Sequence, residues 1–582
     1  MRVTDAASPA RKPDSSPAIF RGWSTHYSVL LLTFATLACL LPFSGKAFHM
    51  DDPLFVWTAQ HIAGHPLDPY GFRVVWYSTE TPIADVTKNP PLASYYAALF
   101  GTLFGWSERV LHWAFLLPAL AVILGTYALA SRFTRVPLLA AGATLAAPGF
   151  LVSGTTVMCD VLMLALWIFA LILWLEGTAS GKNWQFAVAA LLIAASALTK
   201  YFGIALIPLL ATFSIIKKRR LDPSLAYLAI PALLLVLYQH WTHRLYGRGL
   251  LSDAVQYASL HNRGHEIPLL VKTLVGLAFA GGCFLPALFF ALLLWSRRGI
   301  LIALAFCCTA GLATARYPSS FEAPLASSRW PLISALMVVF LLGGISAVAL
   351  AGSGWRNINA ERALLSLWLV GTFLFATFVN WTVNARSILP MVPAAAILVV
   401  LRLEAAGFLA KPRFQAKAGA ALMAAAAMTL WVVWADSDLA NTGREAAYHI
   451  CEQLRPSQAS IYFEGHWGFQ YYMQQLGTRA ADIRKSPFRA GDIVIIPENA
   501  TNSFGPPPGF MLGDTTVTNF DLRGSLATMS QPAGAGFYSS VWGPLPFTFA
   551  KLPPERYLMA KLVPLPENKD PAPLTLGPRS GP

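Results

Sequence analysis

Residues 48–57 read Phe48-His-Met-Asp-Asp-Pro-Leu-Phe-Val-Trp57 and follow an apolar run at 26–43 that is long enough to cross a membrane. Two adjacent carboxylates, Asp51 and Asp52, therefore stand at an expected boundary between membrane and water. Ionisable side chains at membrane depth are rare and costly unless they serve a site. Packing alone does not explain this pair, which therefore indicates a functional site.

The composition of the chain is that of a polytopic membrane protein. Of its 582 residues, 55% are hydrophobic and only 12% are charged, whereas roughly a quarter are charged in soluble domains. The mean hydropathy is +0.51. The net charge of +14 comes from Lys and Arg in short connections between apolar runs, which is the positive-inside pattern rather than a nucleic-acid-binding face. The six cysteines show no paired spacing, which argues against a disulfide framework or a zinc site.

Thirteen apolar runs are predicted to span the membrane, with the N-terminus (residues 1–25) in the cytoplasm and no cleaved signal peptide. Every connection then predicted on the cytoplasmic side carries positive charge, most strongly Lys217-Lys-Arg-Arg220. The apolar stretch 92–105 must be a surface-lying or re-entrant helix, because a further span there would place that cluster outside. The predicted spans are 26–43, 108–131, 136–150, 158–176, 184–198, 203–216, 222–240, 268–295, 300–315, 331–350, 363–380, 388–406 and 416–434.

Two segments are predicted to lie outside the membrane on the far side from the cytoplasm. The first is the loop 44–107, within the transmembrane domain at 26–434. The second is the more polar chain beyond residue 435, with an amphipathic helix at 440–456 and strands at 460–463 and 492–496. This pattern predicts a small periplasmic α/β domain at 435–563, followed by a Pro-rich, disordered tail at 564–582.

Most polar residues that are not needed as membrane anchors fall on the predicted outer side. Carboxylates can deprotonate an acceptor, and Lys or Arg can hold a phosphate leaving group, where negative charge develops as the bond breaks. A site at the membrane surface suits a donor whose phosphate is tethered to a long lipid. The candidates are Asp51, Asp52 and Asp160 as catalytic residues, and Lys88, Asn89, Lys200, Tyr201, Arg316 and Arg386 as substrate-binding residues.

Each candidate also has a plainer interpretation. Asp51 and Asp160 could both cap helices, Asp51 because Pro53 follows it. Lys200 could extend its ammonium to the membrane interface, and Arg386 could anchor a span. The His-rich loop at 243–265 is more typical of a solvated surface than of a metal site. No metal ligand is therefore predicted, and a divalent cofactor stays open.

Five short elements lie in order along the predicted outer side: Asp51-Asp52, Lys88-Asn-Pro-Pro-Leu92, Asp160, Leu198-Thr-Lys200-Tyr201 and Ala385-Arg386-Ser-Ile-Leu-Pro390. In these elements the chain resembles the membrane glycosyltransferases of the GT-C fold. The likeness is greatest to the branch that holds protein O-mannosyltransferases and the aminoarabinose transferases that modify lipid A. It covers the first 210 residues and the Arg386 element, and the order of the elements carries it rather than any single one.

The resemblance implies an all-α polytopic GT-C protein that moves a sugar, with inversion, from a polyprenyl-phosphate-linked donor to an acceptor outside the cytoplasm. The acceptor could be a lipid, a glycan or a protein. It implies that Asp51, with Asp52 beside it, positions or deprotonates the acceptor, and that Lys88 and Arg386, together with Lys200, contact the donor phosphate. Asn89 departs from the His or Lys that is usual before the two prolines, and Ser387 departs from the Tyr that is common after the arginine.

A transporter or a flippase of lipid-linked sugars is the alternative from another functional class. Such proteins often show inverted repeats and helices broken by Gly or Pro at the membrane midplane, and neither is evident in this sequence. The polar candidates also gather at one face rather than along a path through the bundle. The sequence therefore favours an enzyme of the bacterial inner membrane with its active face in the periplasm and no nucleic-acid partner.

Overall fold

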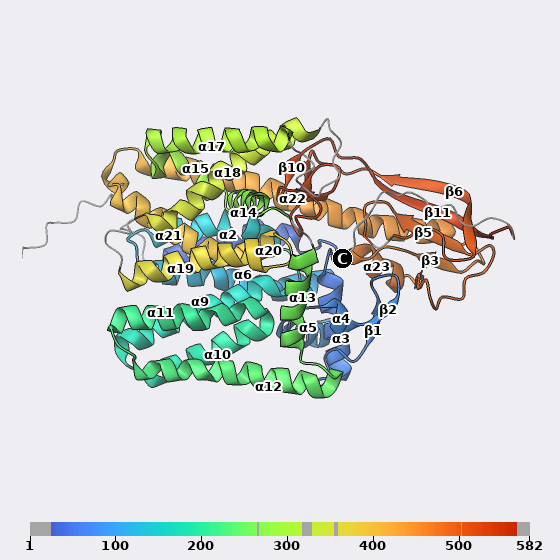
Figure 1. Cartoon of the computed structure of the whole chain (residues 1–582), viewed down its shortest axis with the longest axis horizontal. Coiled ribbons are helices and arrows are strands. Elements are labelled where there is room, and N and C mark those ends of the chain that lie inside the picture. Colours follow the sequence, from blue (N-terminus) through green and yellow to red (C-terminus); the bar gives the residue numbers. More distant parts are fainter. Residues whose placement is uncertain (1–24, 265–266, 317–328, 354–358, 502, 567–582) are drawn as a thin grey trace, which may run out of the picture.

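The computed structural model describes residues 25–264, 267–316, 329–353, 359–501 and 503–566. It consists of a helical bundle and a C-terminal domain, residues 455–566, that contains most of the strands (Figure 1). Within the described chain, ten helical segments are long and apolar enough to cross a membrane. They are α2 with η1 (Thr25–Phe43), α6 (Glu108–Ala130), α9 (Cys159–Ser180), η2 with α11 (Tyr201–Lys218), η3 with α12 (Pro223–Tyr246), α17 (Arg297–Arg316), α18 (Trp330–Gly352), α19 with η7 (Ala360–Val379), α20, η8 and α21 (Ala385–Ala405), and α22 (Phe414–Leu454).

All thirteen predicted spans fall on helices, but three of them are short or broken. The run at 184–198 is α10 (Asn183–Thr199), of 17 residues. The other two are interrupted by prolines that start new helices, because proline lacks an N–H donor and restricts the residue before it. They form α7 (Pro137–Leu145) with α8 (Pro148–Ser153), and α14 (Leu269–Cys283) with α15 (Pro286–Phe289) and α16 (Ala291–Leu294). The mostly helical membrane fold is confirmed, while the number of crossings stays a prediction.

The two ends of the bundle differ in the connections that meet there and in what covers them. At one end, called here the basic end, Lys217 pairs with Glu361 and Arg132 pairs with Glu176, so basic connections distant in sequence come together. The opposite end, called the domain end, carries the C-terminal domain and α13 (Leu250–Gly264), which runs across the bundle helices (Figure 1). The structure thus separates the two sets of connections that the sequence predicts to lie on different sides.

The first predicted outer loop is a folded layer at the domain end. It contains α3 (Asp52–Gly64), the hairpin of β1 (Arg73–Val75) and β2 (Glu80–Pro82), α4 (Ile83–Val86) and α5 (Leu92–Phe104). Helix α5 has only 13 residues, or about 20 Å at 1.5 Å per residue. It is therefore too short to cross the roughly 30 Å hydrocarbon core, which agrees with the surface-lying helix expected at 92–105.

Small residues allow the bundle helices to approach closely. A Cβ atom on Gly281 of α14 would lie 1.9 Å from the carbonyl oxygen of Phe340 in α18. A Cβ atom on Gly344 of α18 would lie 1.9 Å from the carbonyl oxygen of Leu277 in α14. Close contact through small residues is the usual way in which helices associate within a membrane. These two glycines therefore fix the packing of α14 against α18.

Helix α22 joins the bundle to the C-terminal domain without a break. It runs from Phe414 to Leu454, 41 residues, which is about 60 Å at 1.5 Å per residue. The amphipathic helix predicted at 440–456 is its second half, so the domain boundary predicted at 434/435 falls inside one helix. A bilayer core of about 30 Å accounts for only half of this length.

The C-terminal domain is built on a mixed five-stranded sheet, as its α/β pattern predicts. The strand order is β4-β3-β5-β11-β6, with β3 parallel to β4 and β5, and β11 antiparallel to β5 and β6. The predicted strands at 460–463 and 492–496 are β3 and β5. The predicted tail lies outside the described residues from 567 onward, as does the N-terminus up to 24. The bounds are β3 (Ile461–Phe463), α23 (Trp467–Gln475), β4 (Arg479–Ala480), β5 (Ile493–Pro497), β6 (Phe510–Phe520) and β11 (Glu555–Pro564), with the short pairs β7 (Leu526–Ala527) and β10 (Thr548–Phe549), and β8 (Met529–Ser530) and β9 (Ala535–Gly536).

A buried ion pair ties the domain to the bundle. Lys46, in the chain after α2, lies 2.5 Å from Asp436 of α22, and both side chains are 0% exposed. Asp436 also accepts hydrogen bonds of 2.9 Å from Thr528 and from Tyr538 of the C-terminal domain. A buried carboxylate needs such partners, because an unpaired buried charge is strongly destabilising.

Candidate functional site

A cavity of about 670 Å³ lies at the domain end, between the bundle, the first outer loop and the C-terminal domain. Its walls come from the chain around α3 and α4, the starts of α9 and η2, helix α13, the segment 375–387 and the C-terminal domain. Seven of the nine candidate residues line it. They are Asp51, Lys88, Asn89, Asp160, Lys200, Tyr201 and Arg386.

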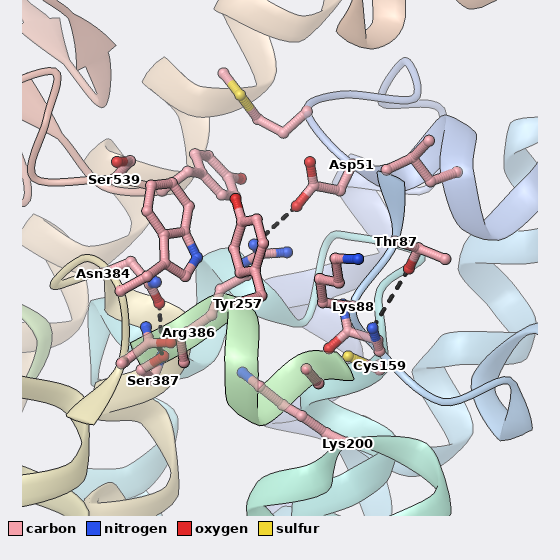
Figure 2. A pocket seen from close by; sticks show the side chains of 18 of the residues that line it. Asp51, Thr87, Lys88, Cys159, Lys200, Tyr257, Asn384, Arg386, Ser387 and Ser539 are labelled. Atoms are coloured by element: carbon pink, nitrogen blue, oxygen red, sulfur yellow. Dashed lines mark hydrogen bonds and ion pairs between the residues drawn. The ribbon is translucent and has the colours of Figure 1, made fainter. Parts of the chain in front are cut away.

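Asp51 faces the cavity and does not cap a helix. Pro53 sits in the first turn of α3, and Asp51 occupies the N-cap position, but its side chain makes no capping hydrogen bond. Its carboxylate instead accepts a 2.8 Å hydrogen bond from Arg386 Nη2 (Figure 2). The side chain is 32% exposed. The capping interpretation therefore does not hold for Asp51, whose carboxylate lines the cavity in contact with Arg386.

Asp52 points away from the cavity, into the protein. It is 0% exposed, and its two oxygens accept hydrogen bonds from the backbone N–H groups of His49 (2.9 Å) and Val157 (2.8 Å). Burial raises the pKa of this carboxyl from 3.8 to about 7. Asp52 thus joins the turn before Asp51 to the turn before α9. Asp52 was predicted as a catalytic residue, but its side chain does not line the cavity. The reason is that successive side chains in the first turn of a helix point in different directions.

Asp160 and Lys200 form an ion pair in the cavity wall. Asp160 lies in the first turn of α9, and its Oδ1 is 2.5 Å from Lys200 Nζ, which comes from the turn after α10. Asp160 is 1% exposed, and its second oxygen is buried without a hydrogen-bond partner within the described chain. Such an oxygen at a cavity wall requires an explanation, which a bound ligand would supply.

Lys88 reaches the cavity from the segment that precedes α5. Its Nζ lies 2.7 Å from Asp253 of α13 and 5.4 Å from the centre of the Tyr257 ring. Asn89 follows it, and the carbonyl oxygen of Asn89 accepts a 2.7 Å hydrogen bond from Tyr70. The position of Lys88 is thereby fixed from two sides, by the chain that carries it and by α13.

Arg386 is at the centre of the charged side chains (Figure 2). The short helix α20 (Ala385–Ile388) carries it, and Asn384 caps that helix by accepting a 2.8 Å hydrogen bond from the Ser387 N–H. Besides Asp51, the guanidinium faces the ring of Tyr538 at 6.0 Å. Its Nε is buried and has no hydrogen-bond partner within the described residues. The membrane-anchor interpretation does not fit these contacts.

Arg316 does not lie with the other candidates. It is the last residue of α17, its side chain is exposed, and it is absent from the described cavity wall. Tyr201 does line the cavity, and its hydroxyl lies 3.3 Å from that of Tyr238 in α12. The sequence could not show which of Arg316 and Tyr201 lines the cavity, because both lie next to predicted spans on the same side of the membrane.

Several cavity residues have no counterpart in the sequence reasoning. Tyr257 lines the cavity from α13. Asp253, which contacts Lys88, lies four residues before it on the same face of that helix. This spacing was a usable signal within the loop after the seventh predicted span. The residues from the C-terminal domain carried no recognisable motif. They are His466, Trp467, Thr501, Met529, Tyr538, Ser539, Val541 and Trp542.

The charge pattern of the cavity fits an anionic ligand. Lys88, Lys200 and Arg386 each contact a carboxylate, respectively Asp253, Asp160 and Asp51. Arginine and lysine are the side chains that bind phosphate, arginine often through two hydrogen bonds at once. Among the described residues, no three His, Cys, Asp or Glu side chains gather into a group that could hold a metal ion.

Residues 88–243 match the model of a protein family, the dolichyl-phosphate-mannose-protein mannosyltransferases. This segment contains Lys88, Asn89, Asp160, Lys200 and Tyr201, and thus most of the elements on which the resemblance was based. The predicted resemblance is confirmed, and so is the class of enzyme that it implies, a membrane glycosyltransferase. No curated protein matches the chain.

Solved structures of similar proteins include ArnT from Cupriavidus metallidurans bound to undecaprenyl phosphate, at 15% identity. The alignment covers 82% of this chain and 94% of that one, with a TM-score of 0.46. The oligosaccharyltransferase AglB from Archaeoglobus fulgidus, in complex with an inhibitory peptide and a dolichol phosphate, is 12% identical. There the alignment covers 83% and 70% of the two chains, with a TM-score of 0.48.

Proposed function

We propose that this protein transfers a sugar from a polyprenyl-phosphate-linked donor to an acceptor outside the cytoplasm, with inversion at the anomeric carbon. The observation that carries the proposal is the contact between Asp51 and Arg386 in one cavity. A carboxylate suited to accept a proton and a cation suited to hold phosphate thus lie side by side. This is the arrangement that displacement of a phosphate by a hydroxyl group requires.

Arg386 and Lys88 bind the phosphate of the donor in this proposal. In the structure each contacts a carboxylate, Asp51 at 2.8 Å and Asp253 at 2.7 Å. An incoming phosphate replaces these contacts with charge-assisted hydrogen bonds to both cations. Lys200, held by Asp160, supplies a third positive charge, and Asn89 and Tyr201 complete the wall beside them. The negative charge that grows on the phosphate as its bond to the sugar breaks is thereby stabilised.

Asp51 acts as the base in the same step. Once phosphate occupies Arg386, the carboxylate of Asp51 is released from its 2.8 Å contact and turns to the acceptor. The acceptor hydroxyl gives its proton to Asp51, and its oxygen forms a bond to the anomeric carbon on the face opposite the phosphate. The bond between that carbon and the phosphate oxygen breaks, and its electron pair leaves with the polyprenyl phosphate. Asp52 supports the step by fixing the turn that presents Asp51.

The topology supports a location in the bacterial inner membrane with the cavity in the periplasm. Positive charge marks cytoplasmic connections, and the basic end lies opposite the cavity. The N-terminus is then cytoplasmic, and the segment 435–563 is periplasmic. The long lipid of the donor lies in the bilayer beside the bundle, while its phosphate reaches the cavity at the membrane surface.

Sugar transfer from a panel of radiolabelled polyprenyl-phosphate sugars tests the proposal, with purified protein in lipid and its Asp51→Asn variant. We expect release of polyprenyl phosphate with the unsubstituted protein and no release with Asp51→Asn. Asp521→Asn, at an exposed position of the C-terminal domain, is the matched control and retains activity. Full activity of a folded Asp51→Asn protein would remove the base assignment. No turnover with any donor, together with uptake of a solute into proteoliposomes, would replace the enzyme by a transporter.

A further inference from the structure

The cavity has two unlike halves. The bundle and the first outer loop contribute its charged side chains, which are Asp51, Lys88, Asp160, Lys200 and Arg386. The cavity residues that the C-terminal domain contributes, within the described chain, are uncharged at neutral pH. This holds for His466 too, because burial lowers its pKa to about 3. The half that the domain supplies is therefore suited to a neutral group rather than to phosphate.

Aromatic rings dominate this neutral half. The ring of His466 stacks on Trp76 of the first outer loop, with 4.4 Å between ring centres and 30° between planes. Trp467 packs on Trp542 at 5.2 Å. All four residues line the cavity, and they are called here the aromatic wall. Hydrogen-bonding groups stand at its edge, since Thr501 Oγ1 lies 2.7 Å from His466 Nε2 and Ser539 lies nearby in the lining.

The backbone holds Trp467 in place at a cost. Its φ is +65°, a region that bulky residues rarely adopt. The next residue, Gly468, lies so close to the chain before Asp51 that a Cβ atom there would be 2.0 Å from the carbonyl oxygen of Phe48. Strain of this kind clusters where a ligand or a reacting group must be held. The start of α23 therefore presents Trp467 next to the segment that presents Asp51.

We propose that the aromatic wall is the binding site for a sugar ring of the acceptor, which stacks on Trp467 and Trp542. The C–H face of a sugar ring packs well on a wide aromatic surface, and its hydroxyl groups need neutral donors and acceptors such as Thr501 and Ser539. A charged peptide would find no counter-charge on this wall, and a lipid tail would make no hydrogen bond to the hydroxyl groups at its edge.

Assigning the ring to the acceptor rests on the function proposed above. The cations that would hold the donor phosphate belong to the other half of the cavity, whereas the wall lies next to the segment 48–50 that precedes Asp51. Met50 and Trp467 also line a common small cavity beside the main one. A ring stacked on the wall turns its edge, with a hydroxyl group, toward the proposed base. The acceptor class is then a glycan or a glycolipid.

Saturation-transfer NMR with methyl hexopyranosides (the mannoside, glucoside and galactoside) tests the site without turnover. The full-length protein is held in lipid nanodiscs without donor. We expect saturation of the ring C–H protons of at least one probe. We expect roughly tenfold weaker binding in Trp467→Leu and near-complete recovery in Trp467→Phe. Trp184→Leu, at an exposed position of α10 outside the described cavity wall, is the matched control. No signal with any probe, or equal binding in Trp467→Leu, overturns the proposal.

Two further measurements separate this inference from the proposed function. We expect farnesyl phosphate, a soluble prenyl phosphate, to leave the bound hexoside in place. Displacement of the hexoside by farnesyl phosphate would put the sugar ring in the phosphate half and overturn the acceptor assignment. In the transfer assay, Trp467→Leu raises KM for the acceptor and leaves KM for the donor unchanged. Trp467-dependent hexoside binding without any release of polyprenyl phosphate would keep the site and reject the transferase. Sugar transfer with an unchanged acceptor KM in Trp467→Leu would keep the transferase and reject the acceptor site on the aromatic wall.

Discussion

The contacts of Arg386 indicate the chemistry of the cavity more clearly than those of the other cations. Arg386 contacts Asp51, faces the ring of Tyr538, and keeps its Nε unpartnered among the described side chains. A planar guanidinium can bind two phosphate oxygens at once, which a lysine ammonium cannot do in the same geometry. The arginine is therefore expected to matter for its shape as well as for its charge.

The first prediction concerns this shape. Arg386→Lys keeps the positive charge but loses the second hydrogen bond, so we expect KM for the donor to rise by roughly tenfold. Arg386→Ala also leaves the charges around it uncompensated and is expected to cost about 2–5 kcal/mol in donor binding. Transfer kinetics at varied donor concentration measure both effects. An unchanged donor KM in Arg386→Lys would show that the guanidinium does not bind the phosphate.

A second residue, Glu464, gives a pH dependence. Its carboxylate is buried beside β3 and accepts hydrogen bonds from the N–H groups of Phe504 and Gly505. Burial nevertheless raises its pKa from 4.5 to about 7. The unfolded chain loses this proton at lower pH than the folded protein does, so the contribution of Glu464 to stability falls as pH rises from about 4.5 to 7.

Glu464→Gln removes that dependence. We expect the variant to be more stable than the unsubstituted protein above pH 7 and to lose less stability between pH 5 and 7. Hydrogen exchange of β3 and β5 amides across this range measures the local opening free energy. Equal slopes in the two proteins would show that Glu464 does not titrate in this window.

Single residues were predicted from the sequence only as far as their types and order allowed. Asp51, Lys88 and Arg386 carry the charges that the chemistry needs, and each lies in the cavity. The contact between Asp51 and Arg386 spans 335 positions of sequence and depends on tertiary packing, so no local pattern could give it. The opposite directions of Asp51 and Asp52 depend on where α3 begins.

At the scale of elements, α13 stands out because it closes one side of the cavity and brings its own charge. Asp253 contacts Lys88 at 2.7 Å and Arg248 at 3.7 Å, and Arg248 also pairs with Asp85. This helix therefore links the cavity to the segment that precedes α5. A carboxylate on Lys88 competes directly with any phosphate that approaches the same ammonium.

The third prediction follows from this competition. Asp253→Asn removes the competing charge, so we expect polyprenyl phosphate to bind more tightly, by up to roughly fivefold, because a partly exposed pair contributes at most about 1 kcal/mol. Binding to the protein in nanodiscs measures the change. Glu80→Gln, which breaks an exposed pair with Lys485, is the control and leaves binding unchanged. Weaker binding in Asp253→Asn would mean that the carboxylate holds Lys88 in its productive position.

The elements themselves were largely foreseeable because apolar runs report burial in lipid directly. The helices of all thirteen predicted spans and the strands β3 and β5 are present. Helix α22 shows the limit of this reasoning. A change from apolar to polar residues at 435 predicts a boundary, yet the hydrogen-bonding of a helix continues through it. The polarity of the residues changes where the chain leaves the lipid, whereas the hydrogen bonds of the helix need no such change.

For the molecule as a whole, the connection between bundle and C-terminal domain decides whether the cavity exists. Both halves of the cavity wall must be held in register, and the pair Lys46–Asp436 with Thr528 and Tyr538 is one buried contact that does so. Tyr538 belongs to this contact and also faces Arg386. The joint and the charged half of the cavity therefore share a residue.

The fourth prediction tests this joint. Lys46→Met leaves Asp436 buried without its counter-charge and is expected to lower stability by about 3–5 kcal/mol. The double substitution of Lys46→Met and Asp436→Leu restores most of that loss, because two apolar residues can replace a buried pair. Thermal unfolding in nanodiscs measures both variants. A single variant as stable as the unsubstituted protein would show that water or another group compensates Asp436.

The unbroken helix α22 also makes the geometry of the cavity sensitive to the thickness of the membrane. A continuous helix that is anchored in lipid and ends in the C-terminal domain can transmit a change of tilt to the aromatic wall, within the limits that the Lys46–Asp436 pair sets. Helices adjust their tilt to the thickness of the surrounding bilayer. Transfer rates are then expected to depend on the acyl-chain length of the host lipids, with an optimum at the thickness that brings the two halves of the cavity together.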